Sequence, residues 1–375
     1  MHYLDYAATT PVPRAVAEEM VTVLTEAFGN PSAQYELGRM AKKRLDTDRA
    51  VIAKVLGCEP KFLHFTSCGT EGDNWAIRAA LWQNRRVGKH IVTTAVEHSA
   101  ILQTMKELER QGYSVTYIKP DKQGDITAEQ VLSAVQPDTA LVSVMLVNNE
   151  TGNRYPIEGI AKGLKGKPTL LHTDAVQGFM KVPFTAASLG ADLITISAHK
   201  IGGPKGIGAL YIGQRIPHPQ PMLFGGGQEQ GLRSGTEATA QIAGFAKAVS
   251  LRQAKMKEGW AHMAALKAMA LEKLGAIPGL VPIGDGSAPH ILSVSLPGYP
   301  SQNIVNDLSA QGICISAGSA CHQGKASHVL VAMGLDKKTA AGTIRISFAP
   351  DSTAEDVEAV VGALAAHQKN RMPML

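Results

Sequence analysis

Apolar residues recur along this chain with two different periods, one helical and one extended. In residues 14–28, Val16, Met20 and Val23 fall on one helical face, and Gly29 follows as a stop signal. Short apolar runs, such as residues 192–196, indicate buried strands. The other helical patterns before residue 230 cover residues 35–56, 71–83, 100–110 and 128–135, and the other strand patterns cover residues 62–65, 90–96, 115–118, 140–147, 169–172 and 209–212. Strands that alternate with helices predict an α/β fold, with a mostly parallel mixed sheet covered by helices on both faces.

The pattern changes in the last third of the chain. A long helical pattern rich in alanine and lysine covers residues 237–274, with one break expected near Gly259. After it come strand and helix patterns at residues 291–296, 301–311, 327–333, 343–348 and 353–367. We interpret them as a smaller α/β domain. The expected division is a large domain of residues 15–255 and a small domain formed by residues 1–14 and 256–375.

Composition places the chain among ordinary globular proteins. Of its 375 residues, 45% are hydrophobic and 18% are charged, and the formal net charge is +5. The apolar runs are too short to span a membrane, the N-terminus shows no secretory pattern, and the short basic clusters contain no interleaved aromatic residues. We therefore expect a cytoplasmic protein without a membrane or nucleic-acid partner.

The four cysteines, at positions 58, 68, 314 and 321, are too few for a disulfide framework and lack paired metal-ligand spacing. This usage is typical of a reducing compartment. We expect no metal site, and any cysteine with a special role should be catalytic.

The candidate chemistry begins with Lys200, which follows the apolar run 192–196 and precedes a run of glycines. Ser197 and His199 flank it. Desolvation at the end of a buried strand lowers the pKa of a lysine, and a neutral amine is the nucleophile that forms a Schiff base with a carbonyl cofactor. The alternative for this segment alone is a solvated loop lysine.

Two other strand ends carry groups that suit an anionic, nitrogen-containing ligand. Gly69 and Thr70 follow a strand and open a helix, where backbone N–H groups can bind an anion; the alternative is a capping box formed by Thr70 and Asp73. Asp174 follows the strand 169–172 and could pair with a protonated ring nitrogen; the alternative is an ordinary helix N-cap.

Two further strand ends complete the set. His98 could stack on a flat cofactor and transfer protons, although a lone histidine is more often a surface residue. Asn149 could hold a carboxylate or a ring oxygen, although asparagine also favours turns. An anion site, an imidazole, an amide, a carboxylate and an amine together match the requirements of pyridoxal phosphate.

The last third contributes a thiol and an arginine. Cys321 lies in a loop of small residues, where exposure and the neighbouring His322 and Lys325 favour a thiolate; the alternative is an incidental loop cysteine. Arg345 lies on the strand 343–348, and its planar fork suits a substrate carboxylate; the alternative is a surface ion pair.

Short motifs spread along nearly the whole chain extend these candidates. They are YLDYAATT at 3–10, GNPS at 29–32, GTEGDN at 69–74, EHSA at 97–100, NNETG at 148–152, HTDAVQ at 172–177, SAHK at 197–200, RSGT at 233–236, SAC at 319–321 and SHVL at 327–330. In this order they resemble the cysteine desulfurases, in the class V aminotransferase branch of the fold-type I pyridoxal-phosphate enzymes, and among these the type that serves iron–sulfur assembly.

The resemblance implies a role for each candidate residue. Lys200 would hold pyridoxal 5'-phosphate as a Schiff base, and Cys321 would be the nucleophile. His98 would stack on the ring and transfer protons. The other implied cofactor contacts are Asp174 to the ring nitrogen, Gln177 to the phenolic oxygen, Gly69, Thr70, Ser197 and His199 to the phosphate, and Thr236 to the phosphate of the partner subunit. Asn149 and Arg345 would position the substrate.

The implied reaction converts L-cysteine to L-alanine and leaves a persulfide on Cys321 for a sulfur acceptor or scaffold protein. Thr236 implies a homodimer with shared active sites. The loop after Cys321 is about two residues shorter than in family members with a long mobile loop, because Lys325 and Ala326 directly precede the next helix. The acceptor therefore stays open among iron–sulfur assembly, tRNA or cofactor thiolation, and another biomolecule.

Three alternatives stay open. A selenocysteine lyase, or another class V enzyme, would share most of these residues. A non-catalytic subunit would be expected to lack Lys200, Asp174 or Cys321, and all three are present.

Overall fold

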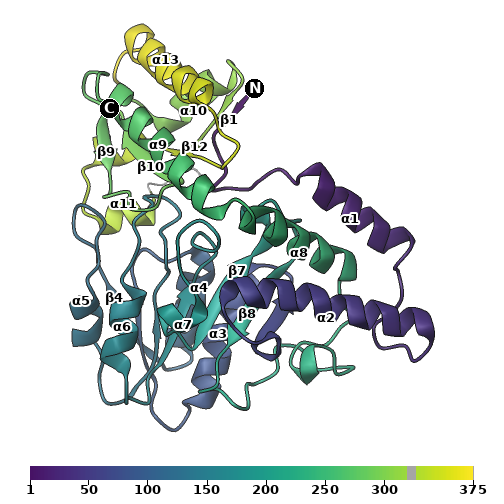
Figure 1. Ribbon diagram of the computed structural model, residues 1–375. Helices are drawn as coiled ribbons and strands as arrows, with labels where there is room; N and C mark the ends of the chain where they lie inside the picture. The colour runs from purple at the N-terminus through teal and green to yellow at the C-terminus, as the bar shows by residue number, and fades with distance from the viewer. Residues whose placement is uncertain (319–326, 375) are drawn as a thin grey trace.

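The computed structural model describes residues 1–318 and 327–374, and its larger part is built on a seven-stranded mixed sheet (Figure 1). In spatial order the strands are β2 (Leu63–Thr66), β8 (Gly208–Ile212), β7 (Leu193–Ser197), β6 (Leu170–Asp174), β5 (Thr139–Ser143), β3 (His90–Thr94) and β4 (Ser114–Ile118). The pairs from β7 to β4 are parallel, whereas β8 is antiparallel to both of its neighbours. The predicted mostly parallel mixed sheet is therefore confirmed.

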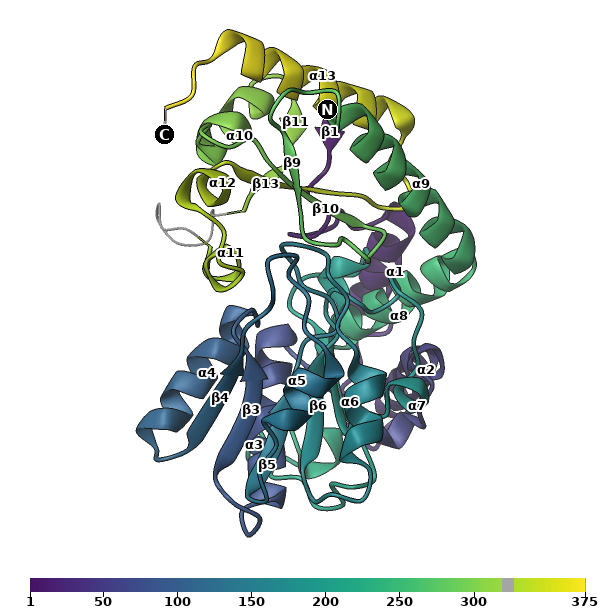
Figure 2. The same ribbon diagram turned by 90° about the vertical axis from the view of Figure 1, so that its left-hand side faces the viewer.

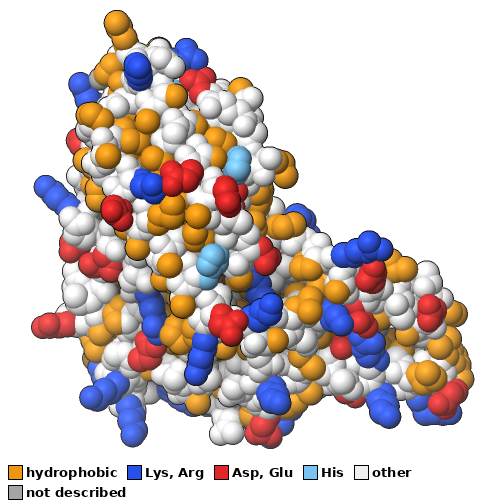
Figure 3. Space-filling view, turned by 45° about the horizontal axis from the view of Figure 1, so that its top comes forward, with side chains coloured by type: hydrophobic (Ala, Val, Ile, Leu, Met, Phe, Trp, Pro, Cys, Tyr) orange, Lys and Arg blue, Asp and Glu red, His pale blue; other side chains and the backbone are white. Residues whose placement is uncertain are grey.

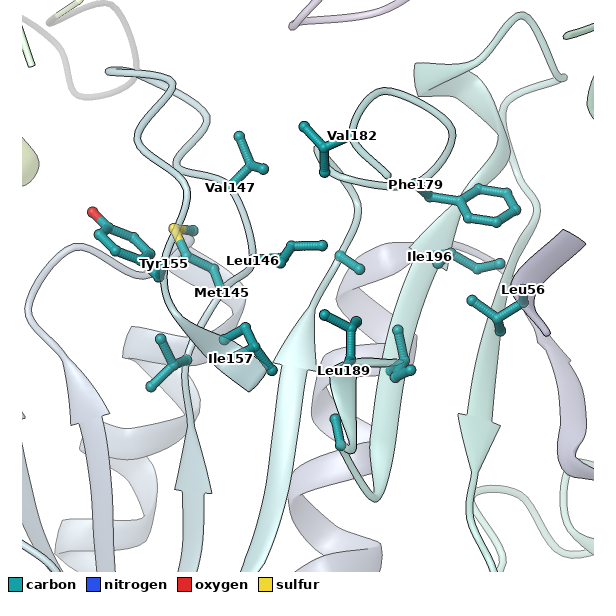
Figure 4. Packing of buried hydrophobic residues seen from close by; sticks show 14 of the residues in the cluster. Leu56, Met145, Leu146, Val147, Tyr155, Ile157, Phe179, Val182, Leu189 and Ile196 are labelled. Carbon is teal, nitrogen blue, oxygen red and sulfur yellow. The ribbon is translucent and has the colours of Figure 1, made fainter. Parts of the chain in front are cut away.

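Helices cover both faces of this sheet. They are α1 (Arg14–Thr25), α2 (Glu36–Leu56), α3 (Gly69–Gln83), α4 (Ser99–Arg110), α5 (Ala128–Ser133), α6 (Ile157–Leu164), α7 (Ala186–Leu189) and α8 (Thr239–Gln253). Successive strand residues point to opposite faces. Ile91 and Leu141 pack with α3 and α4, whereas the next residues, Val92 and Val142, pack in a second core with α2, α6 and α8. Figure 4 shows part of this second core, in which Leu146, Phe179 and Ile196 belong to the same cluster as Leu189 of α7.

A smaller sheet lies beyond the large one, at the top of Figures 1 and 2. Its antiparallel strands are, in order, β12 (Ser316–Ala317), β13 (Thr343–Ser347), β10 (Ile291–Ser295) and β9 (Val281–Ile283), and β1 (His2–Tyr3) pairs with β11 (Ile313–Cys314) beside it. The helices of this part are α9 (Met256–Leu274), α10 (Ser301–Ser309), α11 (His328–Ala332), α12 (Lys337–Ala341) and α13 (Ala354–Asn370). A separate hydrophobic cluster joins these strands to α9, α10 and α13. This separate core supports the predicted smaller unit, while the residue boundaries stay a prediction.

Two predicted element boundaries differ most from the structure. The long helical pattern breaks at Ala254 and Lys255, between α8 and α9, and not at Gly259. Gly259 lies inside α9, where an added Cβ would approach Pro350 to 3.1 Å, so a close helix contact explains the glycine. The strand predicted for 140–147 ends at Ser143, although residues 144–147 are also buried.

Acidic and basic side chains are interspersed over the face shown in Figure 3. Within the described part of the chain, each helix is too short or too polar to cross a membrane.

Candidate active site

A cavity of about 410 Å³ lies where the carboxyl ends of the parallel strands meet the small sheet. Its walls come from the ends of β6 and β7, the start of α3, the N-terminal residues Ala7 and Ala8, and residues 316–318 of the small sheet. The predicted site residues that line it are Gly69, Thr70, His98, Asn149, Asp174, Gln177, Ser197, His199, Lys200 and Arg345. The structure therefore brings together residues from six separate segments, most of which follow strands of the large sheet, as expected for ligands bound at the carboxyl ends of parallel strands.

Lys200 ends a short 3₁₀ helix, Ala198–Lys200, that follows β7 directly. Its Nζ donates hydrogen bonds to the carbonyl oxygens of Ala7 and Ala8, each at 2.8 Å. The N-terminal segment is held against this turn by Thr10, whose Oγ1 donates to the His199 carbonyl and accepts from the Gly202 N–H. The amine is thus fixed in the cavity wall, and the alternative of a solvated loop lysine is wrong.

The start of α3 and the end of β7 form a polar end of the cavity. A Cβ added to Gly69 would lie 2.9 Å from Val176 Cγ2 and 3.8 Å from Ser197 Cβ, so the glycine allows close approach of the backbone. Among the described residues, the buried Ser197 Oγ has no hydrogen-bond partner. Burial and the nearby Lys200 lower the pKa of His199 to about 4, which leaves a neutral imidazole.

The helix N-terminus of α3 and the unpaired hydroxyl of Ser197 fit a phosphate group. The capping box predicted for Thr70 and Asp73 is wrong. Cys68 is the N-cap residue, and no side chain of the described chain caps this helix. Asp73 instead lines the cavity.

Asp174 ends β6 with its carboxylate buried beside the cavity. Its Oδ1 accepts the Val176 N–H at 2.9 Å in the turn that follows, and Asp174 also lines the cavity. The alternative of a helix N-cap is wrong, because the next helix, α7, begins at Ala186 with Thr185 as its N-cap residue. Burial raises the pKa of Asp174, and the charges of His98 and Lys200 oppose that shift. Burial and the nearby Asp174 also raise the pKa of Asp73 well above its ordinary value. A buried carboxylate requires a cationic partner, and a protonated ring nitrogen fits this position.

His98 is the N-cap residue of α4, is exposed and lines the cavity. Its Nδ1 accepts the Ala100 N–H at 3.2 Å, which places the ring proton on Nε2 when the ring is neutral. Glu97, just before it, was not predicted. Burial raises the pKa of Glu97 to about 8. Its Oε1 accepts hydrogen bonds from Thr94 Oγ1 and the Met145 N–H, and so ties α4 to the loop after β5.

Arg345 is buried at the edge of the cavity. Its Nη1 donates to the Asn149 carbonyl oxygen at 2.7 Å, and its Nη2 donates to Asp5 Oδ1 at 2.8 Å. The alternative of a surface ion pair is therefore right about an ion pair but wrong about the surface, because Arg345 is buried. Among the described residues, the buried Arg345 Nε has no acceptor. The turn chemistry that was the alternative for Asn149 belongs to Asn148, whose Oδ1 accepts the N–H groups of Glu150 and Thr151.

Two predicted residues are not placed in the cavity. Thr236 is not among the described residues that line it, although the preceding Arg233 pairs with Glu71 of α3 at 2.9 Å. Cys321 lies outside the described residues. The described residues on either side of its segment do reach the cavity region: Gly318 lines the cavity, and Ser327 Oγ donates to Glu150 Oε2 at 2.5 Å.

Comparisons with known proteins identify the family of this chain. Residues 2–360 match the family described as aminotransferase class-V. A cysteine desulfurase IscS from Clostridium botulinum is 39% identical over 99% of this chain and 95% of its own length. A solved structure titled NifS-like protein is 37% identical with a TM-score of 0.92, covering 98% of this chain and 99% of its own. Another, titled SspA in complex with cysteine, is 33% identical with a TM-score of 0.80, covering 94% and 100%. The chain therefore belongs to the class V aminotransferase family, and its fold is that of the fold-type I enzymes of this family.

Proposed function

We propose that this protein is a pyridoxal-phosphate-dependent cysteine desulfurase, which converts L-cysteine to L-alanine and retains the sulfur on Cys321. The observation that carries the proposal is that Lys200, Asp174, Arg345 and the N-terminal end of α3 line one cavity. Gly318, which precedes the segment of Cys321 in the sequence, lines the same cavity. The full-length similarity to a cysteine desulfurase and to a structure with bound cysteine supports the substrate.

The residues present fit the cofactor in four ways. Lys200 would form the Schiff base, and Asp174 would pair with the ring nitrogen. The N–H groups of Gly69 and Thr70, together with Ser197 and His199, would hold the phosphate, and Gln177 would contact the phenolic oxygen. When bound, pyridoxal phosphate supplies an electron sink that stabilises negative charge at the α-carbon of the substrate.

The chain itself would provide the remaining steps. Arg345 would bind the substrate carboxylate with its fork, and Asn149 would help to orient it. Lys200 and His98 would move protons at the α-carbon and the leaving sulfur. The Cys321 thiolate would attack the substrate sulfur: a sulfur–sulfur bond forms, the carbon–sulfur bond breaks, and its electron pair stays with the carbon skeleton, which takes up a proton to become alanine.

A homodimer would complete the site. Several large apolar side chains on and between α1 and α2 are more than half exposed: Val21, Leu24, Phe28, Tyr35 and Met40. Large apolar side chains that are this exposed support a protein interface. We infer that a second copy covers it and that Thr236 then reaches the phosphate of the partner's cofactor. From the resemblance, a cytoplasmic protein of iron–sulfur assembly is one acceptor class, beside tRNA or cofactor thiolation and another biomolecule.

The test compares Lys200→Ala with Lys205→Ala, a matched control on the exposed turn that follows. The wild type and K205A should show an absorbance band near 420 nm (about the value for a lysine Schiff base) and form alanine from L-cysteine. K200A should lose both. Alanine formation by K200A at the wild-type rate would overturn the assignment of Lys200.

A further inference from the structure

Lys181 is a buried lysine that the steps above do not use. Only 2% of it is exposed, and it lies four residues after Gln177 in the segment that follows β6. Its Nζ donates to Gln177 Oε1 at 3.1 Å. The preceding residue, Met180, has a φ of +58°, a conformation that is unfavourable for a non-glycine residue. The surrounding structure therefore holds Lys181 inward against a local backbone preference.

The surroundings of Lys181 are unfavourable for a charged amine. Burial lowers its pKa well below the ordinary value, and the cations Lys200, Arg252 and Arg345 lower it further. The fully buried His290 is also close enough for Lys181 to lower its pKa, and His199 is affected in the same way. Burial of a polar nitrogen lowers the stability of the fold unless the nitrogen is hydrogen-bonded. The hydrogen bond to Gln177 is the interaction that Lys181 makes in this position.

The side-chain amide of Gln177 is oriented from both ends. Its Nε2 donates to the Ala7 carbonyl oxygen at 2.7 Å, the same oxygen that accepts from Lys200. A carbonyl oxygen only accepts, so the NH₂ group must face Ala7 and the amide oxygen must face Lys181. The NH₂ group has two N–H bonds, and Ala7 takes one of them. Within the described chain, this orientation leaves the second N–H for a ligand in the cavity.

We propose that Lys181 is a positioning residue, which holds the Gln177 amide so that its NH₂ group, and not its oxygen, is presented to the phenolic oxygen of the cofactor. This inference rests on the proposed function. An amide turned the other way would set two acceptor oxygens against each other. In the observed orientation, Gln177 would donate a hydrogen bond to the phenolic oxygen. This hydrogen bond lowers the affinity of the phenolic oxygen and the Schiff-base nitrogen for the proton that they share.

The experiment measures the pH midpoint of the cofactor absorbance change in the holoenzyme. The variants are Lys181→Met, which keeps the length of the side chain without a donor, Lys181→Gln, which restores an N–H donor at similar length, Gln177→Leu, and the double variant K181M/Q177L. K181M should raise the midpoint by about one pH unit, a tenfold change in proton affinity that corresponds to one hydrogen bond. K181Q should lie closer to the wild type.

The double variant distinguishes positioning from a direct electrostatic effect. If Lys181 acts through Gln177, K181M/Q177L has the same midpoint as Q177L. An additive shift in the double variant would overturn the proposal, and so would an unchanged midpoint in K181M. If K181M does not fold, K181Q is compared with the wild type, and a midpoint as high as that of Q177L would overturn it. A wild type that binds no pyridoxal phosphate would instead contradict the proposed function.

Discussion

Arg345 and Asp5, which are 340 positions apart, form an ion pair at the edge of the cavity, with Arg345 Nη2 donating to Asp5 Oδ1 at 2.8 Å. Ser316 Oγ donates to the same carboxylate oxygen at 2.7 Å. The guanidinium proposed to bind the substrate is thus already paired with an acid from the N-terminal segment. A substrate carboxylate has to compete with Asp5 for this donor.

Removal of the competing charge should therefore strengthen substrate binding. Asp5→Asn keeps an acceptor oxygen for Arg345 and Ser316 but removes the negative charge. We expect KM for L-cysteine to fall by roughly two- to tenfold, with the cofactor band unchanged. Steady-state kinetics of alanine formation measures this. Arg345→Lys removes the two-pronged guanidinium and serves as the reference; it should raise KM for L-cysteine. If KM in D5N rises as much as in R345K, Asp5 positions Arg345 and does not compete with the substrate for it.

The buried Glu97 predicts a pH-dependent stability. Its pKa is raised from 4.5 to about 8 in the folded state, so the folded protein binds this proton more tightly than the unfolded chain does. The stabilisation is complete below the unfolded pKa and is lost as the pH rises toward 8, at up to about 1.4 kcal/mol per pH unit.

Glu97→Gln keeps the acceptor for Thr94 and Met145 and cannot ionise. Relative to the wild type, E97Q should gain stability between pH 5 and pH 8 (roughly the window of the shift), measured by urea unfolding. Glu26→Gln, at an exposed position after α1, is the control and should follow the wild type. A constant difference between E97Q and the wild type across this window would contradict the account.

A buried ion pair should hold the loop that leads to Thr236. Arg49 of α2 pairs with both carboxylate oxygens of Glu229, each at 2.7 Å, and Glu229 also accepts the Phe65 N–H. Glu229 and Gln230 both have a positive φ, which this pairing helps to maintain.

Arg49→Met leaves a buried, unpaired carboxylate, so the free energy of unfolding should fall by about 3–5 kcal/mol. The exposed pair of Arg110 and Glu107 provides the control, because R110M should cost less than about 1 kcal/mol. Chemical denaturation compares the two variants. Equal losses would show that the Arg49–Glu229 pair contributes no more than a surface pair.

Local sequence was sufficient to predict the sheet and most of the cavity wall. Asp174, Ser197 and Lys200 were found because each ends or follows a buried strand, and the ends of parallel strands converge. The position of Cys321 stays a prediction, since it lies outside the described residues.

The contacts that sequence reasoning missed depend on distant segments. Nothing near Asp5 indicates its pairing with Arg345, and nothing near Lys181 indicates that it turns inward to Gln177. Gly259 predicts a break that the structure places at Ala254 and Lys255, and Gly259 instead lies in close contact with Pro350. Such choices are decided by tertiary packing and not by local preference.

The most direct test of the account is to locate the sulfur after one turnover. The holoenzyme is mixed with a slight excess of L-cysteine without reductant, and peptide mass spectrometry is combined with alanine quantification. Cys321→Ser is compared with Cys68→Ser, whose thiol also lines the cavity. We predict one added sulfur atom on Cys321 in the wild type and in C68S, with one alanine released per persulfide, and neither product in C321S. Alanine release by C321S at the wild-type level, or the added sulfur on Cys68, would contradict the central claim.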